Sequence, residues 1–587
     1  SCHEIMYLSA ASMQTLRRLE KLELIELYTR EVYRGAAKAV TEPADEPVLS
    51  PAQQAVFDAL CAQMAQETPG AALLHGVTGS GKTLVYIKLI YAARAAGRDA
   101  ILLVPEIALT PQLLERLRAH FGSDVAVLHS SLRVGERYDE WRRIAAGQAH
   151  IVVGTRSAVF APVQDLGVLI VDEEQEHSYK SENTPRYHAR EVAFYRGAQE
   201  NALVLLGSAT PSVESMYRAK SGLYSLYRLT ERYNGRALPR VELADMKQEI
   251  RAGNPGAISA PLLDRLLQNV QDGKQSILFL NRRGNSRCLV CVECGEAPGC
   301  PRCSVSLTYH SANNRLMCHY CGHSQAVPAR CPSCGGALKS VGFGTQRVEQ
   351  ELHELLPDVP VLRMDADTVS ASNDHEAILS RFVREKIPIL LGTQMVAKGL
   401  DFENVTLVGV LDADLSLYFG SFRAAETTFS LVTQVVGRAG RGKSTGTALI
   451  QTMTPEHPVL RLAARQDYDA FYDMEIQLRT LRRFPPLRDV FTVTVTCLHE
   501  DRLIRSAATL RQAIAGNLAA MALTDAELFG PAPAPVAKVN CVYRYRLSLC
   551  CQNSKAVRQM LAFVLRQFAK DPKNRGVSAF IDVNSYD

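Results

Sequence analysis

Short runs of apolar residues alternate along this chain with longer segments that have helical spacing. Between residues 52 and 220 the runs are AALLHG, AILLVPE, HIVVGT, VLIVDEE and ALVLLGS, and after residue 255 they are QSILFLNRR, VPVLRMD, PILLGTQ, VTLVGVLDAD and GTALIQT. Runs that are apolar at nearly every position are typical of parallel strands buried on both faces of a sheet. The pattern therefore predicts two consecutive α/β domains, each with helices packed on a parallel sheet.

The remaining parts of the chain have other patterns. Residues 12–40 place leucines near helical spacing with charges between them, which predicts an amphipathic helix, and an acidic, proline-bearing linker follows at 41–51. Because the chain begins in mid-pattern, we expect that part of the protein precedes it. The residues after 484 carry strand-like patches and a proline-rich link, and they predict a small α+β domain.

Composition and charge narrow the class of protein only slightly. With 47% hydrophobic and 22% charged residues, the chain can bury several cores without disulfides. There is no apolar stretch of 18 or more residues and no signal-peptide pattern, so we expect no membrane contact and a cytoplasmic location. The net charge of +5 is compatible with nucleic acid but does not identify it.

A phosphate-binding loop is predicted at residues 76–83, which fit the pattern GxxxxGK[ST] between an apolar strand and an apolar helix. Glycines allow backbone N–H groups to close around phosphate oxygens at a helix N-terminus. Lys82 is expected to neutralise the β and γ phosphates of ATP, and the hydroxyl of Thr83 to bind Mg²⁺. The alternative is a glycine-rich turn that merely opens a helix. The predicted ATP-binding residues of this loop are Gly76, Val77, Thr78, Gly79, Ser80, Gly81, Lys82 and Thr83.

Two carboxylates, Asp172 and Glu173, end the apolar run VLIVDEE. At that strand end Asp172 can hold Mg²⁺ through water, while Glu173 orients the attacking water. The alternative is that they form a solvated acidic strand end. The presence of a phosphate loop upstream in the sequence disfavours this alternative. Neither motif separates one kind of ATPase from another.

Six motifs in fixed order distinguish the kind of ATPase. They are PEIALTPQ (105–112), GTRSAVFAP (154–162), DEEQ (172–175), GSATP (207–211), LLGTQMVAKGLDF (390–402) and QVVGRAGR (434–441). Together they are the pattern of superfamily 2 helicases. With HSYK, PRYHAR and the CxxC array between the halves, the chain resembles the PriA family of bacterial replication-restart DNA helicases from about residue 15 onward.

The resemblance implies tandem RecA-like motor domains with an inserted two-zinc cysteine-rich module, a partial winged-helix N-terminus and a small α+β C-terminal domain. The expected boundaries are 1–45 for the winged-helix remnant and linker, 46–222 for the first motor domain, 223–287 and 337–480 for the second, 288–336 for the zinc insertion and 481–587 for the C-terminal domain.

Across the cleft between the motor domains, Arg438 and Arg441 are expected to act on the γ-phosphate as arginine fingers, and Gln434 to contact the nucleotide. The alternative for the two arginines is a basic loop that binds DNA phosphates alone.

Several loop residues are candidates for contact with DNA. Thr155, Thr393, Gln394 and Lys398 lie in motifs whose hydroxyl, amide and ammonium groups suit the phosphate backbone. The aromatic and basic residues after DEEQ could stack on bases and report DNA occupancy to the carboxylates, as an aromatic-rich coupling loop does in the family. The alternative is an ordinary surface loop with a core tyrosine. The coupling residues are Tyr179, Lys180, Arg186 and Tyr187, with His188 beside them.

Eight of the 15 cysteines form four CxxC pairs within residues 291–334. Four such pairs can close two tetrahedral sites for structural Zn²⁺, and a redox role is disfavoured. Spacing does not say which pairs share a metal, and His310, His319 or His323 could substitute for a thiolate. The resemblance implies a crossed arrangement. It pairs Cys291 and Cys294 with Cys331 and Cys334, and Cys300 and Cys303 with Cys318 and Cys321.

The function expected from the resemblance is ATP-dependent 3′-to-5′ unwinding of single-stranded and forked DNA during replication restart. The cofactors are ATP, Mg²⁺ and two Zn²⁺. The expected partners are single-strand-binding protein and primosome proteins, and the helicase is expected to work as a monomer at forks in the bacterial nucleoid. Two departures stand out: Gln175 replaces the histidine of DEEH, and the family's domain that holds a DNA 3′ end has no counterpart. A DNA-bound scaffold with a vestigial ATPase and an RNA helicase are the alternatives.

Overall fold

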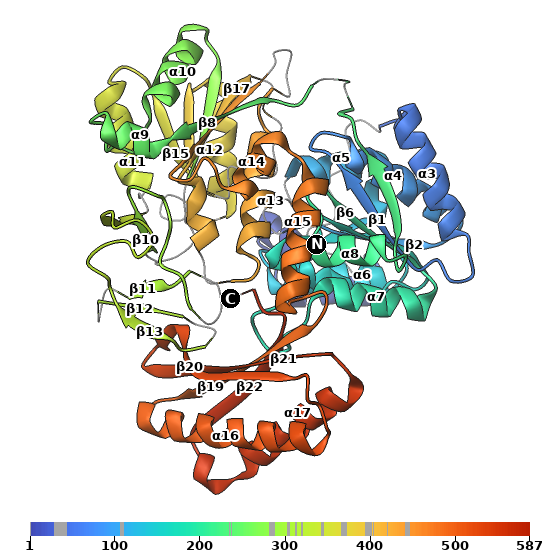
Figure 1. The fold of residues 1–587 in the computed structure, drawn as a ribbon. Helices are drawn as coiled ribbons and strands as arrows, with labels where there is room; N and C mark the ends of the chain where they lie inside the picture. The colour runs from blue at the N-terminus through green and yellow to red at the C-terminus, as the bar shows by residue number, and fades with distance from the viewer. Residues whose placement is uncertain are drawn as a thin grey trace.

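The computed structural model arranges the chain as two parallel-sheet domains, a cysteine-rich insertion and a C-terminal domain (Figure 1). The described residues are 2–28, 44–105, 111–233, 235, 237–280, 288–301, 306–310, 314–318, 321–341, 345–364, 372–393, 402, 404–418, 421–440 and 446–586. Among the helices formed by these residues, none is both long and apolar enough to cross a membrane.

The first domain is a seven-stranded parallel sheet in the order β3-β4-β2-β5-β6-β1-β7, with helices on both faces. The strands are β1 (Ala71–Gly76), β2 (Asp99–Leu103), β3 (Val125–Leu128), β4 (Ile151–Gly154), β5 (Leu166–Asp172), β6 (Leu203–Ser208) and β7 (Ser225–Leu229). The helices are α3 (Pro51–Met64), α4 (Lys82–Ala95), α5 (Pro111–Phe121), α6 (Val134–Ala145), α7 (Ala189–Glu200) and α8 (Val213–Lys220). All five strands predicted in this region are present, and every residue of β2 and β6 is buried.

Two features of this sheet differ from expectation. β3 forms one edge and was not predicted, although all four of its residues are buried. β7 forms the other edge, beyond the domain end expected at residue 222. Only the last residue of β7 is buried, so the strand lacks the continuous apolar run that marks a central strand.

The second domain is a six-stranded parallel sheet in the order β15-β16-β9-β17-β18-β8. Its strands are β8 (Arg240–Asp245), β9 (Gln275–Leu280), β15 (Val361–Met364), β16 (Ile389–Gly392), β17 (Val405–Leu411) and β18 (Thr447–Thr452). Its helices are α9 (Met246–Arg251), α10 (Ala260–Gln271), α11 (Thr345–Leu355), α12 (Ser372–Arg384), α13 (Ala424–Val436), α14 (Pro458–Arg465) and α15 (Tyr468–Arg482). The five predicted strands are confirmed, and β8 adds an unpredicted edge.

The cysteine-rich insertion contains two small antiparallel units. β10 (Cys288–Cys291) pairs with β14 (Leu338–Val341), and a three-stranded sheet joins β11 (Thr308–His310), β12 (Arg315–Met317) and β13 (Ser324–Ala326). Its hydrophobic cluster is small and includes two of the cysteines, Cys300 and Cys318. A module with so little apolar core needs another source of stability, as metal binding provides.

The C-terminal domain is a four-stranded antiparallel sheet, with two helices packed on one face (Figure 1). The strands are β19 (Asp489–Cys497), β20 (Glu527–Val539), β21 (Val542–Cys551) and β22 (Val577–Val583), in the order β20-β21-β19-β22. The helices are α16 (Glu500–Ala520) and α17 (Lys555–Lys570), which bury a separate core with the sheet. The predicted α+β architecture is confirmed.

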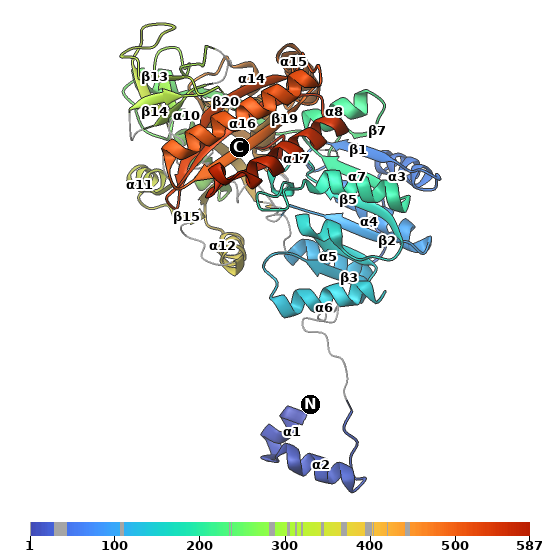
Figure 2. The ribbon, with the colours of Figure 1, turned by 90° about the horizontal axis from the view of Figure 1, so that it is seen from below.

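The predicted amphipathic helix at 12–40 is only partly helical in the described residues. α1 (Cys2–Ser9) and α2 (Met13–Lys21) are short, and residues 22–28 leave the helical conformation. Residues 29–43 lie outside the described part of the chain. Figure 2 shows α1 and α2 standing apart from the two sheets.

Candidate active site and zinc module

The phosphate loop joins β1 to α4 through a tight backbone. Gly79 and Gly81 each have a φ of +79°, in the left-handed region that glycine tolerates best. A Cβ on Gly76 would lie 2.6 Å from Oγ of Ser80, so a side chain at position 76 would crowd the loop. Lys82 begins α4 and donates from Nζ to the carbonyl of Gly76 over 2.9 Å. The predicted residues therefore form a closed turn at a helix N-terminus, the geometry that suits phosphate.

A residue that the sequence reasoning missed supports this loop. Gln53 of α3 is buried and donates from Nε2 to the carbonyl of Ser80 over 2.9 Å. A Cβ on Gly81 would lie 2.3 Å from the same nitrogen, so the helix and the loop are closely packed. The signal in the sequence is a capping box, in which Ser50 and Gln53 each bond the other's backbone N–H.

Asp172 ends β5 and is oriented by a tyrosine of α4. Its Oδ1 accepts from the hydroxyl of Tyr86 over 2.9 Å. Burial, and then the charge of Glu173, raise the pKa of Asp172 to about 6, while Lys82 and the Tyr86 hydrogen bond act in the opposite direction. Gly207 of the neighbouring β6 makes room for that tyrosine, because a Cβ there would lie 1.7 Å from its hydroxyl oxygen. A fixed carboxylate beside Lys82 fits the hard oxygen ligand that Mg²⁺ prefers.

Glu173 is held by two amide groups, one from each motor domain. Its φ of +46° lies in the left-handed region, which is uncommon for a residue with a side chain. Oε2 of Glu173 accepts from Nε2 of Gln175 at 2.8 Å and from Nε2 of Gln434, on α13, at 3.3 Å. Gln175 in turn accepts from Oγ of Ser208 at 2.5 Å. A polar chain therefore runs from the end of β6, through the acidic motif, to the second motor domain.

Two further hydrogen bonds connect α13 with the first domain. The hydroxyls of Thr210 and Ser430 lie 2.7 Å apart, and the backbone N–H of Val213 donates to Glu426 over 2.8 Å. Since Thr210 belongs to the GSATP motif, this motif contacts the second domain directly.

The turn after α13 packs on the phosphate loop. A Cβ on Gly437 would lie 2.4 Å from Oγ1 of Thr78, so the two backbones approach closely. Arg232, which follows β7, donates to two carbonyls of the same turn at 3.3 Å each. Arg438 is next in sequence to the glycine that meets the phosphate loop. Arg441, the other predicted arginine finger, lies outside the described residues.

The predicted coupling loop is packed against other parts of the protein. Tyr179 is only 1% exposed, and its hydroxyl donates to the carbonyls of Leu103 and Asp172 over 3.0 and 2.6 Å. A tyrosine buried in this way offers no free face to a base, so the alternative of a core tyrosine describes the structure. The sequence could not show this, because both carbonyls belong to strands that only the fold brings beside the loop.

The basic residues of the loop contact the C-terminal domain. Lys180 forms an ion pair with Asp582 of β22 at 2.5 Å, and the Arg186 guanidinium lies 4.1 Å from the centre of the Phe580 ring. Tyr187 packs edge-to-face on Phe160 at 4.9 Å. These side chains therefore contact other parts of the protein in this arrangement, and their role in contacting DNA stays a prediction.

The other predicted DNA contacts are only partly described. Thr155 is 8% exposed and follows β4, whereas Thr393 is half-buried at the end of β16. Gln394 and Lys398 lie outside the described residues.

Four thiols gather at one end of the cysteine-rich insertion. The Sγ atoms of Cys291, Cys294, Cys331 and Cys334 lie within 4.8 Å of one another. Across the two pairs, Cys291 to Cys334 measures 3.4 Å and Cys294 to Cys331 measures 3.6 Å. Sulfurs around a tetrahedral Zn²⁺ with bonds of about 2.3 Å are about 3.8 Å apart, so the cluster fits this metal. The first pair shares its site with the fourth, as the crossed arrangement requires.

A second group contains Cys300, Cys318 and Cys321, with Cys300 and Cys321 3.5 Å apart. Cys303, its predicted fourth member, lies outside the described residues. In three of the four pairs a glycine with positive φ follows the second cysteine and donates its N–H to the first cysteine's carbonyl over 2.9 Å. The sequence carries this signal as CxxCG, a turn that points both thiols toward one ion.

The insertion touches two different domains through these turns. The hydroxyl of Tyr418 in the second motor domain donates to the carbonyl of Gly295 over 2.7 Å. A Cβ on Gly322 would lie 3.0 Å from Cβ of Ala532 in β20. The insertion therefore lies between the second motor domain and the C-terminal domain.

Four protein-family profiles match successive parts of the chain. They are a DEAD/DEAH box helicase domain at 50–219, the PriA DNA helicase Cys-rich region domain at 300–325, a helicase conserved C-terminal domain at 341–443 and the primosomal protein N C-terminal domain at 480–586. Their order repeats the order of the structural units.

Curated relatives cover nearly the whole chain. Replication restart protein PriA of Bacillus subtilis is 45% identical over 98% of this chain and 71% of its own length. The protein of the same name from Synechocystis is 41% identical over 91% of this chain and 65% of its own length, and that of Treponema pallidum is 40% identical over 89% and 78%. A solved structure of RecG bound to a three-way DNA junction overlaps 74% of this chain, with 17% identity and a TM-score of 0.45.

Proposed function

The chain belongs to the PriA family of replication restart proteins, and on that premise we propose how its residues perform ATP-driven unwinding of DNA. Its motor domains are those of an ATP-dependent DNA helicase. The chain spans between 65% and 78% of the length of the three relatives described, so activities that need the rest of those proteins are part of the proposal.

We propose that ATP binds at the phosphate loop and is hydrolysed by groups from both motor domains. Lys82 would leave the carbonyl of Gly76 to neutralise the β and γ phosphates. Thr83 and Asp172 would hold Mg²⁺, which would supply further charge neutralisation on the phosphates. Glu173 orients the attacking water. Arg438 approaches the γ-phosphate when the cleft closes on the nucleotide, and it stabilises the developing charge.

One observation supports this assignment most directly: the contact between Glu173 and Gln434 across the cleft at 3.3 Å. An amide of the second domain already reaches the carboxylate that would activate water. Because α13 also bears the turn that packs on the phosphate loop, a small rotation of this helix changes both contacts at once. Cycles of such movement would advance the grip of one domain along the DNA strand relative to the other.

The test is ATP turnover with and without single-stranded DNA, for the parent and for Lys82→Ala. We expect DNA to stimulate the parent and Lys82→Ala to lose turnover by at least about a thousandfold, the scale of a lost phosphate-charge contact. Lys88→Ala is a matched control, since that lysine lies on the same helix and contacts exposed Glu46 and the ring of Phe57, away from the phosphate loop. If the rate of ATP turnover is changed neither by added DNA nor by Lys82→Ala, the motor assignment is refuted. If RNA stimulates turnover and DNA does not, the substrate is RNA.

We propose that the insertion binds two Zn²⁺ ions, one at each cysteine group, with Cys303 completing the second. All-cysteine ligation leaves no open position, so both metals would be structural. We expect close to two equivalents of zinc per chain by metal analysis, and one equivalent would refute the two-site proposal. Cys318→Ser should impair unwinding more than ATP hydrolysis, because the insertion lies away from the nucleotide and between two domains. Equal loss of both activities would assign it a purely structural role.

We further propose that the helicase acts on stalled or branched forks in the bacterial nucleoid as a monomer, and that single-strand-binding protein and primosome proteins are its partners. The support is the family membership together with the primosomal C-terminal domain. Co-sedimentation of the chain with each partner, with and without a forked DNA, tests this assignment. Failure to bind single-strand-binding protein at equimolar concentrations would remove that partner.

A further inference from the structure

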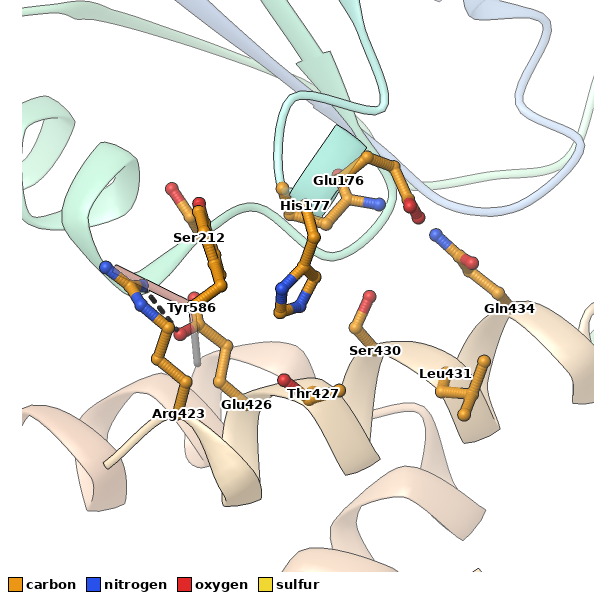
Figure 3. A pocket seen from close by; sticks show the side chains of 11 residues that line it. Glu176, His177, Ser212, Arg423, Glu426, Thr427, Ser430, Leu431, Gln434 and Tyr586 are labelled. Carbon is orange, nitrogen blue, oxygen red and sulfur yellow. Dashed lines mark hydrogen bonds and ion pairs between the residues drawn. The ribbon is translucent and has the colours of Figure 1, made fainter. Parts of the chain in front are cut away.

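The segment that follows β22 reaches the junction between both motor domains. Tyr586 lines a pocket there with His177 of the first domain and Arg423 of the second (Figure 3). The ring centres of Tyr586 and His177 are 4.2 Å apart, and the Arg423 guanidinium lies 4.7 Å from the centre of the same tyrosine ring. A single side chain of the C-terminal domain therefore touches both halves of the motor.

A hydrogen bond fixes the tyrosine on the side of the first domain. His188 Nε2 and the Tyr586 hydroxyl are 3.3 Å apart, and His188 Nδ1 accepts from the backbone N–H of Arg190. Burial, and then the neighbouring positive charges, lower the pKa of His188 well below its usual range, so its ring is neutral. A neutral ring that accepts at Nδ1 carries its proton on Nε2, and His188 therefore donates to the tyrosine oxygen.

The first-domain partner is connected to the catalytic carboxylates. His177 begins a single 3₁₀ turn that ends at Tyr179, and the Tyr179 hydroxyl donates to the carbonyl of Asp172 over 2.6 Å. Lys180, the next residue, pairs with Asp582 of the strand that leads to Tyr586. The loop after the acidic motif is thus attached to the C-terminal domain at two residues, His177 through Tyr586 and Lys180 through Asp582.

The second-domain partner is held just before α13. Arg423 forms an ion pair with Glu214 of the first domain at 2.5 Å, and the tyrosine ring covers its guanidinium. At the other end of α13, Gln434 donates to Glu173. The arrangement that Tyr586 stabilises is therefore one in which the water-orienting carboxylate is bonded to the second domain's amide, and Lys82 to the carbonyl of Gly76.

We propose that Tyr586 is a positioning residue that latches the two motor domains in the arrangement in which Glu173 is bonded to Gln434. DNA binding, by moving the C-terminal domain or the loop at 176–188, would withdraw the tyrosine and free Glu173 for water. The inference rests on the proposed ATPase and adds to it a restraint imposed by the C-terminal domain.

The experiment compares the full chain with Tyr586→Ala and Tyr586→Phe, each assayed for ATP turnover without DNA and at saturating single-stranded DNA. Tyr586→Ala should raise the DNA-free rate at least threefold and leave the DNA-saturated rate within twofold, so that the stimulation ratio falls. Tyr586→Phe keeps the ring contacts but loses the hydrogen bond with His188, so its DNA-free rate should lie between those of the parent and Tyr586→Ala. Tyr195→Ala, at a tyrosine that is 68% exposed on α7, is the matched control and should change neither rate.

A second variant approaches the latch from the motor side. His177→Ala should also lower the stimulation ratio, and combining it with Tyr586→Ala should add little, because residues in contact are not independent. An unchanged ratio in Tyr586→Ala, or a parallel fall of both rates with a lower unfolding temperature, would overturn the latch. Absence of any DNA-stimulated turnover in the parent would instead overturn the proposed function itself.

Discussion

Gln175 offers the sharpest test of how the acidic motif is organised. It is 8% exposed, donates to Glu173 at 2.8 Å and accepts from Ser208 at 2.5 Å. Replacing Gln175 with alanine removes both bonds and leaves Glu173 with the longer contact from Gln434. The contact of Lys82 within the phosphate loop is not altered. Gln175→Ala therefore tests how Glu173 is positioned without disturbing the binding of the nucleotide.

The size of the effect follows from the charge on Glu173. A hydrogen bond to a charged group contributes about 1.5–3 kcal/mol. The lower end of that range applies, because Gln175 orients Glu173 and does not itself touch the reacting atoms. About 1.4 kcal/mol in an activation barrier is a factor of about ten in rate. Gln175→Ala should therefore lower kcat for DNA-stimulated ATP hydrolysis about tenfold.

The assay is steady-state ATP hydrolysis at saturating single-stranded DNA, with kcat and KM determined separately. Gln175→His, which restores the residue of the DEEH motif, retains a ring N–H donor and should lose less than alanine. Gln268→Ala is the control, because its amide bonds only exposed Asp272 among the contacts described. A raised KM with unchanged kcat would show that Gln175 supports nucleotide binding and does not orient Glu173.

Three other perturbations test the packing around the site. Gly207→Ala places a Cβ 1.7 Å from the Tyr86 hydroxyl oxygen and should cost about 1–3 kcal/mol of unfolding free energy; an unchanged urea midpoint would contradict this. Arg479→Ala deprives Glu426 and Glu475 of a buried partner, at 2.7 and 2.9 Å, and should cost about 3–5 kcal/mol in the same measurement; a loss below about 1 kcal/mol would mean that water replaces the arginine. Removing zinc with a chelator should make the insertion sensitive to protease while binding of an ATP analogue persists; loss of both together would contradict independent units.

The parts of the site that the sequence predicted are those that depend on local chemistry. The phosphate loop and the acidic motif are short, and their function requires particular residues at fixed spacing within a strand-to-helix turn. The buried strands other than β3 were predicted because burial on both faces removes polar residues from nearly every position. β7 and β8 were missed because edge strands keep one side exposed, and their sequences SLYRL and RVELAD carry the mixed pattern of that environment.

The parts that the sequence could not predict depend on contacts between distant segments. The basic and aromatic residues around Lys180 favoured contact with DNA as the prediction. Its carboxylate partner Asp582 lies some four hundred residues later along the chain, so the ion pair could not be predicted from the sequence. Gln53 supports the phosphate loop from a different helix. The grouping of the cysteines was likewise open on spacing alone, and the structure brings the thiol of Cys291 beside that of Cys334.

The connection between the nucleotide and the C-terminal domain passes through one rigid element. α13 has 13 residues and, at about 1.5 Å per residue, is about 20 Å long. Arg423 precedes it beneath the Tyr586 ring, Ser430 and Gln434 contact the GSATP and DEEQ motifs, and the glycine after it meets the phosphate loop. A helix resists bending over that length, since each turn is held by its own hydrogen bonds. A displacement of one end of α13 must therefore move the other end. A movement of the phosphate loop can reach Tyr586 through this helix alone, without a change in the conformation of the loops.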